Sequence, residues 1–225
     1  QSSTKVSGIS SATLEMGGFR KNEKTGLWEA YKTDASYKDI LEELQKMVGK
    51  YNETPNFQTA ERLFDLAATA RREEGLINSK QLTTQGGTVE PTLDAKKLKE
   101  GLAAYHSTPE IRKALSLYEK FKNRGLDSLV TAGVLDQQTV NGLKENAGYV
   151  PWFRFSENVD GSLNIKAVKE FSKGLINRSQ MQDLKGGKVE DVEINNVLDN
   201  MAKLSNWMVN KSVGNDTAKY LTTFA

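Results

Sequence analysis

The chain has 225 residues, of which 37% are hydrophobic and 27% charged, and it contains no cysteine. This composition predicts a modest hydrophobic core in one large domain or two small ones, and it excludes disulfides, zinc–thiolate sites and thiol catalysis. The formal net charge of +2 argues against strong electrostatic attraction to nucleic acid or acidic lipid, and no apolar run approaches the ~18 residues of a membrane span.

The first 34 residues are predicted to form a flexible entry followed by a β-hairpin. Residues 1–11 are Ser-rich and have no hydrophobic period. Two short extended runs, 13–20 and 27–32, flank a polar turn that ends at Gly26, which is typical of a hairpin. Because an isolated hairpin is marginally stable in water, we expect it to pack on another part of the protein.

Residues 35–148 are predicted to be a helical bundle. Asp34 or Ser36 is placed to cap a first helix, whose apolar residues recur at three- and four-residue steps: Tyr37, Ile40, Leu41, Leu44, Met47 and Val48. Thr54-Pro55 predicts the start of a second helix, with proline in its first turn, that runs to Gly75. We expect these two helices to pair as an antiparallel hairpin.

The rest of this bundle is expected to alternate helices with Gly- and Pro-marked breaks. Residues 78–91 read as a polar loop and 93–105 as a helix, and Pro109 predicts the start of another helix. Gly125 is expected to separate that helix from a short one that Gly133 ends. Asp136 is placed to cap a final helix that runs to about Glu145.

The stretch at 149–155 is the strongest break in the helical pattern. Pro151 has no N–H and biases Val150 away from helical dihedrals, so we expect an extended, aromatic strap. Residues 149–189 are expected to hold this strap and loops, and 190–225 a long C-terminal helix that Gly214 breaks. The predicted fold class is therefore mainly α, with helical hairpins and a bundle, a small N-terminal β-hairpin and the strap.

No catalytic constellation is visible. His106, the only histidine, has neither an orienting carboxylate nor a nucleophile close in sequence, so we interpret it as a surface or capping residue. The glycine pairs match no phosphate-binding motif, and the acidic residues at helix ends are accounted for by the helix dipole. We therefore expect no enzyme, no cofactor and no metal in this segment.

Two features of the sequence could bind nucleic acid. Aromatic and basic residues of the strap could stack single-stranded nucleic acid, although we favour a hydrophobic strap laid across helices. A Gly-containing basic segment could meet phosphate, although an ordinary basic turn is the simpler interpretation; its cations are Arg178, Lys185 and Lys188.

Three segments, taken in order, resemble the giant polyvalent proteins of tailed bacteriophages. This family includes internal virion (ejection) proteins and virion-packaged RNA polymerase polypeptides. The segments are 57–76, with its Ala70-Arg71-Arg72 end; 108–135, with a Leu-Val-Thr-Ala-Gly-Val-Leu end; and a Tyr-Val-Pro-aromatic-x-Arg signature. The residues that fill this signature are Tyr149, Pro151, Trp152, Phe153 and Arg154. Trp152 departs from the smaller apolar residue commoner there, and the N-terminal hairpin has no counterpart.

The resemblance implies a non-enzymatic structural segment of a protein stored in the capsid interior and expelled with the genome. Such a protein would be delivered into the host envelope or cytoplasm and help genome delivery. Implied partners are other domains or subunits of the same virion protein, as a homo-oligomer, with phage DNA as a further candidate. The alternative is a nucleic-acid-binding segment of a virion-packaged polymerase. Because the chain opens on Gln1 and stops on Phe224-Ala225, we also expect a piece of a longer polypeptide, with an artificial boundary as the alternative.

Overall fold

A computed structural model describes residues 2–78, 83–84, 87–88, 93–145 and 197–222. These residues form a mainly helical protein with a small antiparallel β-hairpin near the N-terminus, as predicted, and the described part contains seven helices. The predicted strap at 149–155 and the loops up to 189 lie outside the described residues.

The Ser-rich N-terminus forms helix α1 (Ser2–Met16), so the predicted flexible entry was wrong. The prediction failed because α1 has almost no apolar stripe and is held by tertiary packing. Ser10 and Thr13 are buried, and the Ser205 hydroxyl donates a hydrogen bond to the Ser10 carbonyl at 3.2 Å. Residues 13–16 therefore belong to a helix and not to the first strand.

The β-hairpin pairs β1 (Gly17–Lys21) with β2 (Trp28–Lys32) in antiparallel register, with Phe19 opposite Ala30. Gly17 has φ +90°, and a Cβ there would lie 2.2 Å from the Thr33 hydroxyl oxygen, so only glycine fits the step from helix to strand.

Helix α2 (Tyr37–Gln45) begins with a complete capping box. The N-cap is Ser36 and not Asp34, and Ser36 and Asp39 exchange side-chain-to-backbone hydrogen bonds. The predicted helical hairpin does not form, since α2 packs mainly along α5, and α3 (Phe57–Asn78) pairs with α4 (Ala95–Ser107). Helix α3 also begins two residues after Pro55, where the Asn56 side chain accepts the Thr59 N–H.

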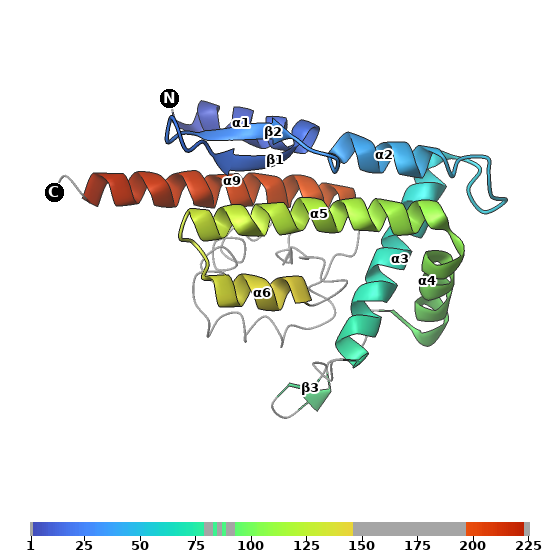
Figure 1. Ribbon diagram of the computed structural model, residues 1–225. Helices are drawn as coiled ribbons and strands as arrows, with labels where there is room; N and C mark the ends of the chain where they lie inside the picture. Colours follow the sequence, from blue (N-terminus) through green and yellow to red (C-terminus); the bar gives the residue numbers. More distant parts are fainter. Residues whose placement is uncertain (1, 79–82, 85–86, 89–92, 146–196, 223–225) are drawn as a thin grey trace, which may run out of the picture.

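The α3–α4 pair is closely packed and projects at one end of the molecule (Figure 1). Asp94 caps α4 by accepting the Lys97 N–H at 2.8 Å. In the sequence, the segment that connects α3 to α4 contains a second, minimal hairpin of β3 (Thr83–Thr84) and β4 (Gly87–Thr88), within the segment predicted to be a loop.

Helix α5 (Pro109–Thr131) is the central element, with proline in its first turn as predicted. It runs unbroken through Gly125, because that glycine is a packing site and not a terminator. A Cβ at Gly125 would lie 2.1 Å from the Met208 sulfur of α9. Gly133, at φ +71°, follows the helix end as predicted.

The last two described helices are α6 (Gln137–Glu145) and α9 (Val197–Thr222). Asp136 caps α6 as predicted, accepting the Thr139 N–H at 2.7 Å. Helix α9 continues through Gly214, so the predicted break was wrong. It lies beside α5 and α1, and its C-terminal end and the N-terminus of α1 lie at the same end of the molecule (Figure 1).

The core lies where α5 meets α2, α9 and β1. Its largest fully buried side chains come from all of these elements, from α3 and from the turn after α2: Phe19, Ile40, Leu44, Met47, Phe64, Ile111, Tyr118, Phe121, Leu129, Leu198, Met201 and Met208. No described helix is long and apolar enough to cross a bilayer.

Candidate functional site

The residues that the sequence analysis named as the family signature and as possible nucleic-acid contacts are not described by the structure. All eight lie outside the described residues: Tyr149, Pro151, Trp152, Phe153, Arg154, Arg178, Lys185 and Lys188. The strap and the basic segment therefore stay predictions, and the described residues define a different candidate site at the N-terminal hairpin.

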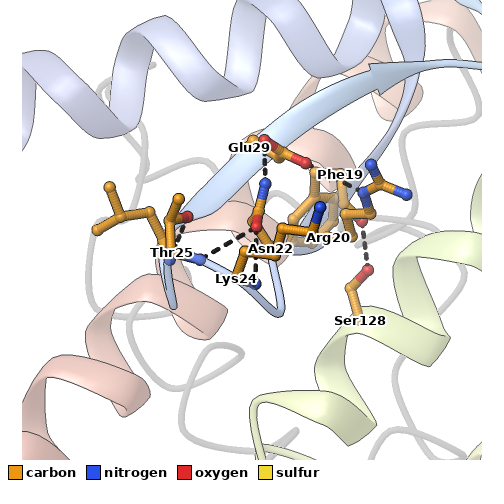
Figure 2. Close-up of polar contacts among 8 residues, drawn as sticks. Phe19, Arg20, Asn22, Lys24, Thr25, Glu29 and Ser128 are labelled. Atoms are coloured by element: carbon orange, nitrogen blue, oxygen red, sulfur yellow. Dashed lines mark hydrogen bonds and ion pairs between the residues drawn. The ribbon is translucent and has the colours of Figure 1, made fainter.

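The hairpin is fixed to α5 by a buried hydrogen bond. The Ser128 hydroxyl donates to the Phe19 carbonyl at 2.6 Å, as Figure 2 shows. The Phe19 ring is 1% exposed and lies 5.6 Å from the Trp28 ring, with the two planes tilted by 42°. The hydrogen bond between the Phe19 carbonyl and the Ser128 hydroxyl and the contact between the two aromatic rings thus hold this side of the hairpin in place.

The turn of the hairpin is organised by Asn22. Its side-chain oxygen accepts the N–H groups of Lys24 and Thr25 at 3.0 and 3.1 Å, and its amide donates to the Glu29 carboxylate at 3.0 Å (Figure 2). Arg20 also donates to Glu29, at 3.1 Å. The hydrogen bonds from Asn22 and Arg20 lower the pKa of Glu29.

A cavity of about 600 Å³ opens between this hairpin and α5. Such a volume is typical of small-molecule sites. Its lining includes cationic and anionic side chains together with the Tyr31 ring: Phe19, Arg20, Lys21, Asn22, Glu23, Gly26, Tyr31, Arg124, Asp127, Ser128 and Thr131.

Most of the charged groups around this cavity are paired within the protein. Lys21 of β1 meets Asp216 of α9 at 2.6 Å, and the Lys144 ammonium of α6 bonds to Asp127 of α5 at 2.5 Å. These pairs join the hairpin to α9 and α5 to α6. They neutralise the cations and anions that a charged ligand would need.

Asp34 joins the end of the hairpin to α5. Its carboxylate accepts from Lys120 at 2.6 Å and from Arg124 at 2.5 Å. The hydrogen bonds from Lys120 and Arg124 hold the pKa of Asp34 well below its usual range. Because the Asp34 side chain is 61% exposed, solvent screens these pairs and their contribution to stability is small.

Two further carboxylates hold the bundle together. Glu110 at the start of α5 accepts from Lys50 and from the Tyr51 hydroxyl. Burial raises the pKa of Glu110, but these two hydrogen bonds outweigh burial and leave it lowered. Glu73 of α3 is 1% exposed and accepts the Leu93 N–H at 3.0 Å, which ties α3 to the residue just before α4.

Lys122 of α5 is the most deeply buried lysine described, with 2% of its surface exposed. Burial lowers the pKa of its ammonium group. It is not among the residues that line the hairpin cavity.

His106 is exposed in the last turn of α4, in agreement with its interpretation as a surface residue. Its ring lies edge-on to Tyr105 at 5.2 Å, and Arg112 donates to the Tyr105 and His106 carbonyls at the helix end. Among the described residues, no group of three or more His, Cys, Asp or Glu side chains is placed to hold a metal ion.

A second, shallower hollow of about 510 Å³ lies between α2, α3 and the start of α9. Tyr37, Leu41, Phe57 and Leu198 supply its apolar lining. Burial raises the pKa of the Tyr37 hydroxyl, and the charges of Asp199 and Glu61 add to this shift.

Comparison with known proteins gave no match to a family model, to a curated protein or to a solved structure. The chemistry of the site therefore comes from its geometry alone. The described charged side chains form ion pairs that connect the hairpin to α5 and α9 and connect α5 to α6.

The sequence analysis did not predict the ion pairs around the N-terminal hairpin. Their partners lie far apart in the chain, with Lys21 and Asp216 separated by 195 positions, so no local motif marks them. Only the polar turn from Asn22 to Gly26 was visible as a signal, and it predicts the hairpin without its partners.

Proposed function

We propose that this chain is a non-enzymatic structural segment of a phage internal virion protein that is ejected with the genome and contributes to genome delivery across the host envelope. The observation that carries the proposal is the pairing of charged side chains between elements distant in sequence. An ion pair joins Lys21 of the hairpin to Asp216 of α9. Two more join Asp34, just after the hairpin, to Lys120 and Arg124 of α5.

The ordered resemblance of three segments to phage giant polyvalent proteins supplies the biological setting. A mainly helical body is compatible with a part that packs against other domains or subunits of a long polypeptide. The capsid interior and then the host envelope or cytoplasm are the proposed locations, and other copies or domains of the virion protein are the proposed partners.

The alternative function, nucleic-acid binding in a virion-packaged polymerase polypeptide, has less support. The net charge is +2, and the cations beside the hairpin cavity are bonded to carboxylates. Binding of single-stranded DNA whose affinity falls steeply with salt, and that Trp152→Ala or Arg154→Ala abolishes, would favour this alternative.

The proposal is tested on virions of the phage that encodes the chain. Purified particles are treated with protease before and after the capsids are opened, and peptides of this chain are quantified by mass spectrometry. A capsid-interior protein yields its peptides from intact particles and becomes protease-sensitive only after opening. Absence of these peptides from purified virions would refute the proposal.

A further inference from the structure

Strand β2 has outward backbone groups with no hydrogen-bond partner among the described residues. In an antiparallel pair, residues alternate between hydrogen-bonded and non-hydrogen-bonded positions. The Asn22 N–H donates to the Leu27 carbonyl, and the Thr33 N–H donates to the Met16 carbonyl. Counting along the register from both ends, Arg20 with Glu29 and Gly18 with Tyr31 are the hydrogen-bonded pairs.

The alternate residues of β2 therefore point their N–H and carbonyl groups away from β1. These residues are Trp28, Ala30 and Lys32, and none of them has a backbone hydrogen bond to another described part of the chain. On the opposite edge, the outward carbonyl of Phe19 is taken by Ser128. Ala30 is partly exposed and Lys32 is exposed, so this part of β2 meets solvent, while α1 also packs against the strand.

An open edge of this kind is a template for another extended strand. The edge of β2 is self-complementary. When a second β2 strand pairs antiparallel with the first and the two Ala30 residues lie opposite each other, each of the five residues of β2 lies opposite a residue of the other copy. The outward N–H and carbonyl groups of Trp28, Ala30 and Lys32 in one copy then face those of the other copy. Trp28 then lies opposite Lys32 of the second copy.

Charge favours the same register. Pairing about Ala30 places Glu29 opposite Tyr31 of the second copy, where the hydroxyl can donate to the carboxylate. Within each copy, Arg20 bonds to Glu29 and lies 5.0 Å from the centre of the Tyr31 ring, so a cation flanks each such pair. A shift by one step toward Trp28 would place two Glu29 carboxylates directly opposite each other, which is unfavourable.

We infer that two copies of this chain associate through the β2 edges, forming a four-stranded antiparallel sheet of order β1-β2-β2-β1 about a two-fold axis. Such an interface is isologous and closes at two copies. The inference rests on the ladder of the hairpin and is independent of the proposed function. A dimer that is absent from virions would refute the function and leave this inference intact.

The test measures mass against concentration for the full chain, by sedimentation or light scattering, up to millimolar concentration. The wild-type chain should pass from one to two chain masses. Ala30→Pro should remain at one chain mass, because proline removes the outward N–H of Ala30 without removing a β1–β2 hydrogen bond. Ala30→Ser, which keeps the N–H, is the matched control and should dimerise like the wild type.

Amide hydrogen exchange on the wild-type chain tests the inference without any variant. Protection at Trp28, Ala30 and Lys32 should rise with chain concentration, while Glu29 and Tyr31, already bonded to β1, should change little. A single chain mass at all concentrations would overturn the inference. So would a dimer that persists in a folded Ala30→Pro variant, or edge protection that appears only when a different protein is added.

Discussion

Gly101 of α4 lies at a close contact between α3 and α4. A Cβ at this position would lie 2.6 Å from the Ala70 Cβ and 2.7 Å from the Leu66 carbonyl oxygen. Neither atom is the end of a flexible side chain, so rotation of a side chain cannot relieve the contact. Since carbon atoms prefer separations of roughly 3.5–4.0 Å, Gly101→Ala should force the two helices apart by about 1 Å.

Two opposing terms set the size of the effect. Replacing glycine by alanine inside a helix stabilises the helix by about 1 kcal/mol, and overpacking a close contact costs about 1–3 kcal/mol. Separation of the helices also weakens the stacking of Arg71 on the Tyr105 ring, now 4.5 Å from the ring centre. We therefore expect Gly101→Ala to lower the free energy of unfolding by about 1–2 kcal/mol.

Gly214→Ala is the matched control for this substitution. Gly214 is also inside a helix, but it is exposed and its Cβ would meet nothing within 4 Å. The Gly214→Ala substitution should therefore raise the free energy of unfolding by up to about 1 kcal/mol. Urea unfolding followed by circular dichroism measures both, and a melting shift of about 2–4 °C per kcal/mol is expected for this size. Equal stabilisation by both substitutions would refute the close packing of α3 on α4.

Three further predictions concern polar contacts. Ser36→Ala should lower the free energy of unfolding by about 1 kcal/mol, because the N-cap of α2 is lost. Thermal unfolding measures this loss, with Ser36→Thr, which keeps the hydroxyl, as the control. A double-mutant cycle of Lys21→Met and Asp216→Asn should give a coupling of about 0.2–1 kcal/mol that weakens with salt, whereas strict additivity would mean that the pair does not join hairpin and helix. The pKa of Glu110 is lower in the folded chain than its ordinary value of 4.5, so its stabilisation is present above that pH and lost as pH falls through the folded pKa. Unfolding measured against pH should therefore lose stability in this acidic range, and Glu110→Gln should flatten the loss; an unchanged slope would contradict the role of its bond to Lys50.

The elements that the sequence predicted well carry local signals. Ser36 with Asp39 forms a capping box, Pro109 opens α5 and Asp136 caps α6, and each acts within a few residues of its own position. These side chains satisfy backbone N–H groups or fix dihedral angles that any helix start requires. Their physical effect is therefore visible without knowledge of the fold.

The elements that were missed depend on packing. Helix α1 has almost no apolar stripe, and it packs against α9, where the Ser205 hydroxyl donates to the Ser10 carbonyl. Gly125 looks like a helix terminator in the sequence, but it provides the space that Met208 fills. The same limit applies to the candidate site, where ion pairs join residues from opposite ends of the chain and no spacing rule can identify them.

The central claim of genome delivery is tested most directly by following the chain during infection. Cells are infected with isotope-labelled virions while host and phage protein synthesis is blocked, and empty capsids, envelope and cytoplasm are then separated. If the chain is ejected with the genome, its labelled peptides should leave the particles and appear in the envelope or cytoplasmic fraction as DNA enters. Labelled peptides that remain with the emptied capsids would contradict the claim.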